Sequence, residues 1–423
     1  MRVSKYFLSC MAILAFGATA RADWDIGDPA KWVQLPDLTP KGMDVNATRG
    51  TDAIGLAPPR IILADDFLCT STDAITDIHL WGSWKNDLLP QVAAPQAPNF
   101  VADPESVRFR LSIHADIPAQ QNPLGFSKPG EELWSGVFEP GEFTARRYAT
   151  DIEEGWLDPL APEYLFPGDT VAWQYNFLID EADAFIQQGT RDNPLVYWLD
   201  VHAEPINQNP QIEQPLFGWK TSADQFNDTA VYGPSQIANF PVVDAWTPIT
   251  PPAMPGQPGD FNNDNFIDDL DIDLLRGAVI SATSDPQFNV DGLNDPNIPD
   301  AADFAHLITS IIGTLRGDGD LNYLVNFADF VLVSNNFGMS GTNYIEGNYN
   351  VDNITNFEDF VFVANNFNMS APRPPLDMAF VITPEPASGL LLLALAVVAT
   401  ARQKRLVNRR REISRCVTTH RMR

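Results

Sequence analysis

A 30-residue internal repeat is the feature that most constrains how this chain folds. The segment 317–330, GDGDLNYLVNFADF, realigns with the segment 347–360, GNYNVDNITNFEDF, and both copies continue into Asn-Asn-Phe. The polar residues keep the same spacing in the two copies. A period this short with matched polar spacing indicates one loop–helix unit that is used repeatedly.

The polar residues of these units are spaced like the ligands of a calcium ion. A calcium loop wraps the ion with oxygen atoms at positions 1, 3, 5, 9 and 12 and with the backbone carbonyl of position 7. Three segments, here named the first, third and fourth loops, fill all six positions, and calcium (Ca²⁺) is the expected cofactor. Their residues are Asp260, Asn262, Asp264, Phe266, Asp268 and Asp271; Asp318, Asp320, Asn322, Leu324, Asn326 and Asp329; and Asn348, Asn350, Asp352, Ile354, Asn356 and Asp359.

A further unit, the second loop, departs from this spacing. It has the two ends of a loop, with about three extra residues that include Pro296 between them, so we expect it to be degenerate. Its candidate ligands are Asn289, Asp291, Asp300 and Asp303.

Position 6 of a calcium loop normally needs a positive φ. Asn265 and Asn353 tolerate that conformation, whereas Tyr323 does not readily adopt it, so we expect the third loop to be weakened. An array of Asx-rich turns without metal is the alternative interpretation of all these loops.

The complete loops resemble those of the type I dockerin family. That family also closes its loops with Asp at position 12 and opens them with Gly-Asp, seen here as Gly259-Asp260 and Gly317-Asp318. The resemblance covers residues 259–370 and implies a small α-helical, calcium-binding block. It also suggests a cohesin-like protein partner, by analogy only, because cellulosomal dockerins have two loops in a module and this block has about four.

The region 23–246 has the pattern of an antiparallel β protein. Apolar Val107, Phe109, Leu111 and Ile113 alternate with polar residues, and similar short runs are separated by Pro, Gly and Asn. We expect a mainly β chain, with an antiparallel β-sandwich or jelly roll followed by a Pro-rich linker at 247–258.

The segment 376–382 follows the repeats and is apolar on both faces. Prolines bound it, and it is too short for a stable helix, so a buried strand is the expected structure. The repeat block offers no sheet. We therefore predict that the chain returns and pairs within the amino-terminal sheet, which makes the repeat block an insertion.

Both ends of the chain have the composition of targeting signals. Residues 1–22 read as a secretory signal peptide, with basic residues, an apolar run and small residues before the expected cleavage site. Near the other end, Pro384, Glu385 and Pro386 precede an apolar stretch at 390–401 and a basic cluster.

This carboxyl-terminal segment, 383–405, resembles a PEP-CTERM sorting signal. The resemblance implies a cell-surface or extracellular location, cutting by an exosortase-type enzyme near Pro386, and transient membrane contact through 390–401. An ordinary membrane anchor is the alternative. The basic tail at 406–423 is longer than is usual for such signals.

The net charge of the chain and its lack of catalytic motifs reduce the number of functions that fit the sequence. A formal charge of −28 disfavours nucleic acid as a partner and favours divalent cations. No nucleophile, zinc or phosphate-loop motif is present, so an enzyme is the less favoured interpretation. We expect His79, His114 and His202 to be ordinary strand residues, and the carboxylate pairs 65–66 and 153–154 to be solvated.

Three functions remain open. The first is a non-catalytic surface protein for adhesion or for glycan or matrix binding, in which one or two exposed tryptophans could stack on sugars. The second is a polysaccharide-degrading enzyme or accessory subunit recruited through the repeat block, and the third is a structural matrix protein.

The amino-terminal region also resembles an uncharacterised β-rich domain of bacterial surface proteins, through segments 64–69, 77–85 and 197–201. That resemblance implies location rather than activity.

Overall fold

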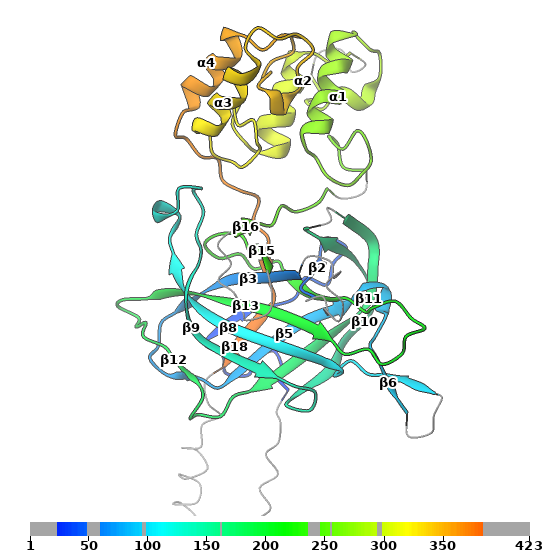
Figure 1. Ribbon diagram of the computed structural model, residues 1–423, viewed down its shortest axis with the longest axis vertical. Coiled ribbons are helices and arrows are strands. Elements are labelled where there is room, and N and C mark those ends of the chain that lie inside the picture. The colour runs from blue at the N-terminus through cyan, green and yellow to red at the C-terminus, as the bar shows by residue number, and fades with distance from the viewer. Residues whose placement is uncertain are drawn as a thin grey trace, which may run out of the picture.

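The computed structural model describes residues 23–48, 60–94, 99–160, 163–235, 246–253, 256–293 and 298–383. A β body carries a block of short helices at its upper end, and two chain segments connect them (Figure 1). The expectation of a mainly β chain with a small helical block is confirmed. The signal peptide, the sorting signal and the basic tail lie outside the described residues.

The larger sheet of the β body has eight strands, and five of them close into a ring. β14 pairs with both β2 and β5, so the hydrogen-bonded order runs β5-β11-β10-β2-β14 and back to β5. All pairings in this ring are antiparallel except β10 with β2. In sheet order the strands are β1 (Trp32–Gln34), β18 (Phe380–Thr383), β5 (Asp77–Trp84), β11 (Glu163–Leu178), β10 (Phe143–Asp158), β2 (Met43–Asn46), β14 (Phe217–Ser222) and β17 (Asp377–Met378).

Gly82 permits the closure of this ring. A Cβ atom on Gly82 would lie 2.4 Å from the carbonyl oxygen of Gly218 and 2.4 Å from the Phe217 ring. Real Cβ atoms do not approach that closely, so β5 and β14 can meet here only because residue 82 has no side chain.

The second sheet has six strands and shares the core of the first. Val107, Phe109, Leu111 and Ile113 are fully buried, which confirms the alternation expected from the sequence. The Phe109 ring lies 5.1 Å from the ring of Phe217 in the larger sheet. In order, the strands are β16 (Thr247–Pro248), β15 (Val231–Ser235), β3 (Arg60–Cys69), β13 (Leu195–Pro205), β8 (Val107–Ile117) and β9 (Lys128–Phe138). Two short ladders complete the body, formed by β4 (Ala74–Ile75) with β12 (Phe185–Ile186) and by β6 (Gln91–Ala93) with β7 (Phe100–Ala102).

The segment 376–382 lies in the larger sheet, where the sequence predicts it. β18 pairs with β5 on one side and with β1 on the other, and β17 pairs with β14. Met378, Phe380, Val381 and Ile382 are fully buried. The repeat block is therefore an insertion between strands of the β body.

The helical block consists of α1 (Asp269–Ile280), α2 (Ala301–His306), α3 (Phe327–Asn336) and α4 (Phe357–Asn366). It has its own apolar core, to which Ile272, Leu275, Phe304 and Tyr344 contribute. The last two units exchange backbone hydrogen bonds, from Val325 N–H to the Met369 carbonyl and from Thr355 N–H to the Met339 carbonyl. Each loop is therefore held by the segment that follows the helix of the other unit.

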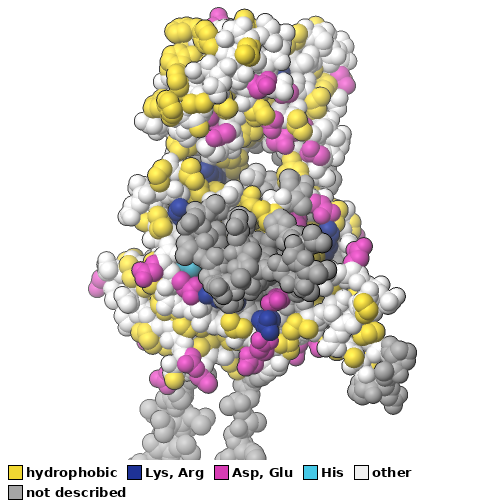
Figure 2. Space-filling model, viewed as in Figure 1, with side chains coloured by type: hydrophobic (Ala, Val, Ile, Leu, Met, Phe, Trp, Pro, Cys, Tyr) yellow, Lys and Arg dark blue, Asp and Glu magenta, His cyan; other side chains and the backbone are white. Residues whose placement is uncertain are grey.

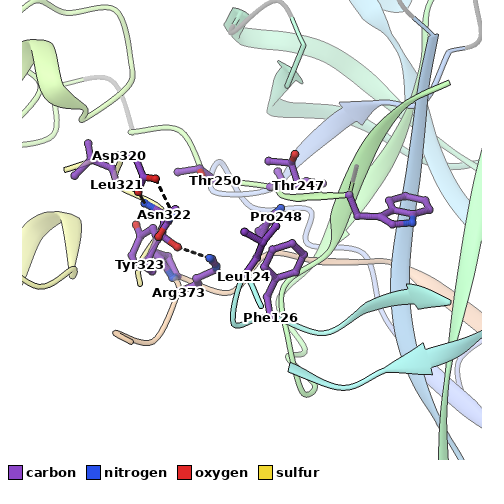
Figure 3. Close-up of a pocket in the computed structure, with 13 residues that line it drawn as sticks. Leu124, Phe126, Thr247, Pro248, Thr250, Asp320, Leu321, Asn322, Tyr323 and Arg373 are labelled. Atoms are coloured by element: carbon purple, nitrogen blue, oxygen red, sulfur yellow. Dashed lines mark hydrogen bonds between the residues drawn. The ribbon is translucent and has the colours of Figure 1, made fainter. Parts of the chain in front are cut away.

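Arg373 joins the helical block to the β body. Its guanidinium lies 5.1 Å from the Phe126 ring centre of the β body and 5.4 Å from the Tyr323 ring centre of the third loop. It also donates a hydrogen bond to the Asn322 carbonyl (Figure 3). A cavity of about 240 Å³ opens beside these residues, between the two parts of the chain.

None of the tryptophan side chains is exposed, whereas a sugar-stacking surface would need one or two exposed rings. All ten lie in the described residues; eight are buried, and Trp32 and Trp134 are half-buried. The six-stranded and eight-stranded sheets bury these rings in their cores, as large apolar side chains favour.

The expectation of solvated carboxylates at 65–66 and 153–154 is wrong for three of the four residues. Asp65, Asp66 and Glu154 are fully buried. Met378 N–H donates to Asp65 Oδ2 at 2.7 Å, so the returning strand covers this carboxylate. Pairing between strands that lie far apart in the sequence buries these residues. The local pattern of polar and apolar residues does not reveal this burial.

Burial of Asp66 and of Asp377 in β17 makes the stability of the β body depend on pH. It raises the pKa of Asp66 to about 8 and that of Asp377 to about 7. The folded state then holds protons that the unfolded state has lost, so the free energy of unfolding falls as pH rises from about 4 to about 8. We expect Asp66→Asn to reduce this fall, measured by denaturant unfolding at several pH values. The exposed Asp73→Asn is the control, and an equal pH slope in all three proteins contradicts the prediction.

Candidate calcium-loop site

One carboxylate ties each loop to the helix that follows it. In the first loop, Asp271 Oδ1 accepts hydrogen bonds from the N–H groups of Phe261 at 2.7 Å and Asn262 at 3.3 Å. Its other oxygen accepts from Asp268 N–H at 3.1 Å. The residue at position 12 therefore holds the start of the loop against the start of α1.

The other three loops close in the same way. Asp329 accepts from Gly319 N–H at 2.7 Å, and Asp359 accepts from Tyr349 N–H at 2.7 Å. In the second loop, Asp303 accepts from Val290 N–H at 2.8 Å and from Asp300 N–H at 2.8 Å. The two ends of the second loop therefore meet, and the expectation that the extra residues between them make this loop degenerate stays a prediction.

Position 9 caps the following helix in every unit. Asp268, Asp300, Asn326 and Asn356 each accept a hydrogen bond from the backbone N–H two residues later, and the position 12 carboxylate accepts from their own N–H. This reciprocal arrangement is a capping box. Asp or Asn at this position therefore starts the helix and also presents an oxygen to the loop.

Position 1 organises the turn in the first and third loops. The Asp260 carboxylate accepts from Asp264 N–H at 3.2 Å and from Asn265 N–H at 3.1 Å. The buried Asp318 accepts from Asn322 N–H at 3.1 Å and from Tyr323 N–H at 2.8 Å. Both turns thus point two backbone donors at the first ligand.

The fourth loop differs at this position. The Asn348 amide nitrogen donates to the carbonyls of Thr342 at 3.3 Å and Asp352 at 3.2 Å. Its side-chain oxygen is buried and has no hydrogen-bond partner among the described residues. A buried amide oxygen without a donor is costly, and a bound cation would satisfy it.

The third loop adopts the conformation that the sequence argued against. Tyr323 has φ 66°, close to the 67° of Asn265, whereas Asn353 is not among the described residues with positive φ. The Tyr323 hydroxyl donates to the Ile312 carbonyl at 3.1 Å, and Arg373 lies over the ring. These tertiary contacts compensate for the strain of a left-handed tyrosine.

Carboxylates converge in the first and third loops. In each of the sets Asp260, Asp264, Asp271 and Asp318, Asp320, Asp329, one oxygen per residue lies within 4.8 Å of the others. Burial raises the pKa of Asp271 to about 6 and that of Asp318 to about 7. Ionisation of these two carboxyls therefore costs more than it would in water.

The remaining ligand positions line the same turns. Asn262 donates to Asp264 at 2.7 Å, Asn322 to Asp320 at 2.9 Å and Asn350 to Asp352 at 3.1 Å. The position 7 carbonyls of Leu324 and Ile354 accept from the position 9 amides at 3.5 Å and 3.3 Å. Phe266 N–H donates to Asp264 at 2.9 Å, and Leu293 N–H donates to Asp291 at 2.8 Å.

Ser112, His114 and Asp200 lie together in the six-stranded sheet but are not arranged as a nucleophilic triad. Both Ser112 and His114 bond to Asp200, at 2.6 Å and 2.7 Å, so the carboxylate separates the hydroxyl from the imidazole. His79 bonds to Asn176 at 2.8 Å in the core. A serine nucleophile needs the imidazole itself as its base, and this arrangement does not provide one.

The sorting motif Pro384, Glu385 and Pro386 lies outside the described residues, as does the apolar stretch 390–401. Within the ranges that the structure covers, no helix has both the length and the apolar character needed to span a membrane.

Comparison with known proteins identifies a family for the β body. No curated protein and no solved structure matches the chain. Residues 30–264 match the family model described as a domain of unknown function, DUF7901, and this match covers more than half of the chain and ends inside the first loop. The chain therefore belongs to the DUF7901 family.

Proposed function

We propose that this protein is an exported, non-catalytic calcium-binding protein of the cell surface or extracellular matrix. The observation that carries the proposal is the common geometry of the four loops, each closed by a position 12 carboxylate. Three converging carboxylates in two of the loops match the oxygen donors that calcium prefers.

Calcium would stabilise the helical block and its place on the β body. Divalent charge offsets the repulsion among buried carboxylates, and binding energy adds directly to folding energy. The third loop reaches the β body through Tyr323 and Arg373, so an ordered third loop also fixes this junction. We interpret the two sheets of the β body as a variant of the antiparallel sandwich, suited to adhesion or matrix contact.

The proposed location depends on the two ends of the chain. A signal peptide at 1–22 would export the protein, and an exosortase-type enzyme would cut near Pro386 after transient membrane contact through 390–401. The acidic composition fits an extracellular setting in which calcium is abundant.

A second candidate function is docking to a protein through the repeat block. Apolar side chains gather over α3 and α4 (Figure 2). Phe327 and Phe357 are 65% and 64% exposed at the same position of two successive units. The other exposed members are Phe337, Met339, Phe367 and Met369. Exposed apolar patches of this kind mark interaction surfaces, which favours a cohesin-like partner over a polysaccharide for this face.

The first loop should bind calcium most tightly because it has four acidic ligands, whereas the fourth has two. We expect Asp264→Asn to lower the affinity of this loop at least about tenfold, because it removes one ligand charge and keeps the side chain's size. Calorimetric titration of the full chain measures the affinity, and thermal unfolding measures the stabilisation by calcium.

Asp269→Asn is the matched control, since it removes the same charge one residue after the cap and outside the ligand positions. We expect it to keep the calcium affinity. If wild-type protein shows no calcium binding and no calcium-dependent rise in melting temperature, the proposed function is wrong.

A further inference from the structure

The ring of five strands encloses a second polar cluster, far in sequence from the calcium loops. Each strand of the ring contributes one side chain to it, and all of them are at most 2% exposed. They are Asp44 from β2, Ser83 from β5, Glu154 from β10, Asp169 from β11 and Lys220 from β14.

Lys220 lies between two of the carboxylates. Its Nζ atom donates to Asp44 Oδ2 at 2.6 Å and also to Glu154 Oε2. One oxygen each of Asp44, Glu154 and Asp169 lies within 4.8 Å of the others. A single ammonium group therefore faces three carboxyl groups in a site without solvent.

Five oxygen atoms of this cluster are buried and form no hydrogen bond of normal geometry with a described residue, although Asp44 and Ser83 lie close enough to the Asp169 carboxyl to interact with it. Buried polar atoms are nearly always bonded, so a group of five requires a physical explanation. They are Asp44 Oδ1, Glu154 Oε1, both carboxyl oxygens of Asp169 and the Ser83 hydroxyl.

The backbone brings two of these acids face to face. Glu154 and Asp169 are directly paired across β10 and β11, and the register shifts on both sides of Glu154. Like charges directly opposite each other destabilise a sheet, and irregularities of this kind redirect side chains. The ring thus concentrates negative charge instead of separating it.

We infer that the ring binds one divalent cation through Asp44, Glu154, Asp169 and the Ser83 hydroxyl. The donors are all oxygen, which selects a hard cation such as calcium or magnesium. Two positive charges together with Lys220 balance three carboxylates. Oxygen atoms within 4.8 Å of one another also fit around one ion, since calcium–oxygen bonds are about 2.4 Å long.

The competing state is a cluster that holds a proton instead of a metal. Burial raises the pKa of Asp169 to about 10, so this carboxyl keeps a proton at neutral pH when no cation is present. The two states differ in whether purified protein contains, or takes up, a metal ion at this place.

Terbium is a suitable probe, because it replaces calcium and emits when a nearby tryptophan is excited. A Cβ atom on Gly218 would lie 2.6 Å from both the Asp44 Cβ and the Trp156 ring, so Trp156 lies next to the site. The repeat block contains no tryptophan, but Trp246 lines a cavity together with Asp320 and Asn322 of the third loop. The emission of the ring site is therefore read in the double variant Asp264→Asn with Asp320→Asn, in which the calcium loops are altered. We expect this full-length variant to show tryptophan-sensitised emission that competes with calcium.

Asp169→Asn should weaken this site at least about 100-fold, because it removes a charged ligand. Added to the double variant Asp264→Asn with Asp320→Asn, it should abolish the emission, and metal analysis should find one divalent ion fewer per chain than in that double variant. The double variant Asp264→Asn with Asp320→Asn is the matched control, since it alters the calcium loops and should keep the emission.

The inference is overturned if the double variant Asp264→Asn with Asp320→Asn shows no such emission at saturating terbium. It is also overturned if a folded protein that carries Asp169→Asn in addition keeps the emission. Ser83→Ala removes only a hydroxyl group, and it is the second test variant if the Asp169→Asn protein does not fold. We expect it to lower the affinity about tenfold, and an unchanged affinity counts against the site. The calcium loops are tested by separate variants, so failure here leaves the proposed function standing.

Discussion

Truncation after Arg373 is expected to unfold the β body. It removes β17 and β18, with the fully buried side chains of Met378, Phe380, Val381 and Ile382. Burial of each such side chain contributes about 1.5–3 kcal/mol, and together they approach the whole stability of a typical domain, about 5–15 kcal/mol. Circular dichroism and denaturant unfolding of the truncated protein measure the loss.

A chain that ends at Thr383 is the control, because it keeps every described strand. The single change Phe380→Ala should cost about 3–5 kcal/mol, whereas the exposed Val137→Ala should have little effect. A truncated protein that retains the cooperative unfolding of the control would show that the returning strand is only a linker.

Replacement of Lys220 by methionine is the second change with a large expected effect. It removes the ammonium group that bonds to Asp44 and Glu154 and leaves three buried carboxyls with no basic partner. Breaking a buried ion pair from one side costs about 3–5 kcal/mol, because the remaining charge is uncompensated. The midpoint of denaturant unfolding should fall accordingly.

Lys41→Met is the matched control, since Lys41 is exposed and the substitution is chemically the same. We expect its stability to stay within about 0.5 kcal/mol of wild type. Equal stabilities for the two variants would mean that Lys220 is not needed to balance the buried acids.

The geometry of the loop–helix units could be predicted from the sequence because it is local. The cap at Asp268, the closing carboxylate Asp271 and the turn at Asp260 all bond to residues within ten positions. Spacing alone therefore identifies them. The return of residues 376–382 was also predictable, since a strand that is apolar on both faces must find a sheet.

The ring and its acidic cluster could not be predicted in this way. Glu154 bonds to Lys220 across 66 positions of the sequence, and Asp44 bonds to Lys220 across 176. In a strongly acidic chain, the sequence alone also does not distinguish these carboxylates from the many others. Tyr323 shows the same limit inside a loop. A tyrosine disfavours a positive φ, but the contacts of its side chain with Ile312 and Arg373 stabilise this conformation at Tyr323.

The insertion of the repeat block determines how the molecule carries a pulling force. From the last helix, the chain reaches Thr383 only through β17 and β18. Tension between a partner held by the repeat block and the carboxyl end must therefore pass along β18, which is hydrogen-bonded to β1 and to β5. Extraction of that strand requires the hydrogen bonds to both neighbours to break, so the sheet resists the force.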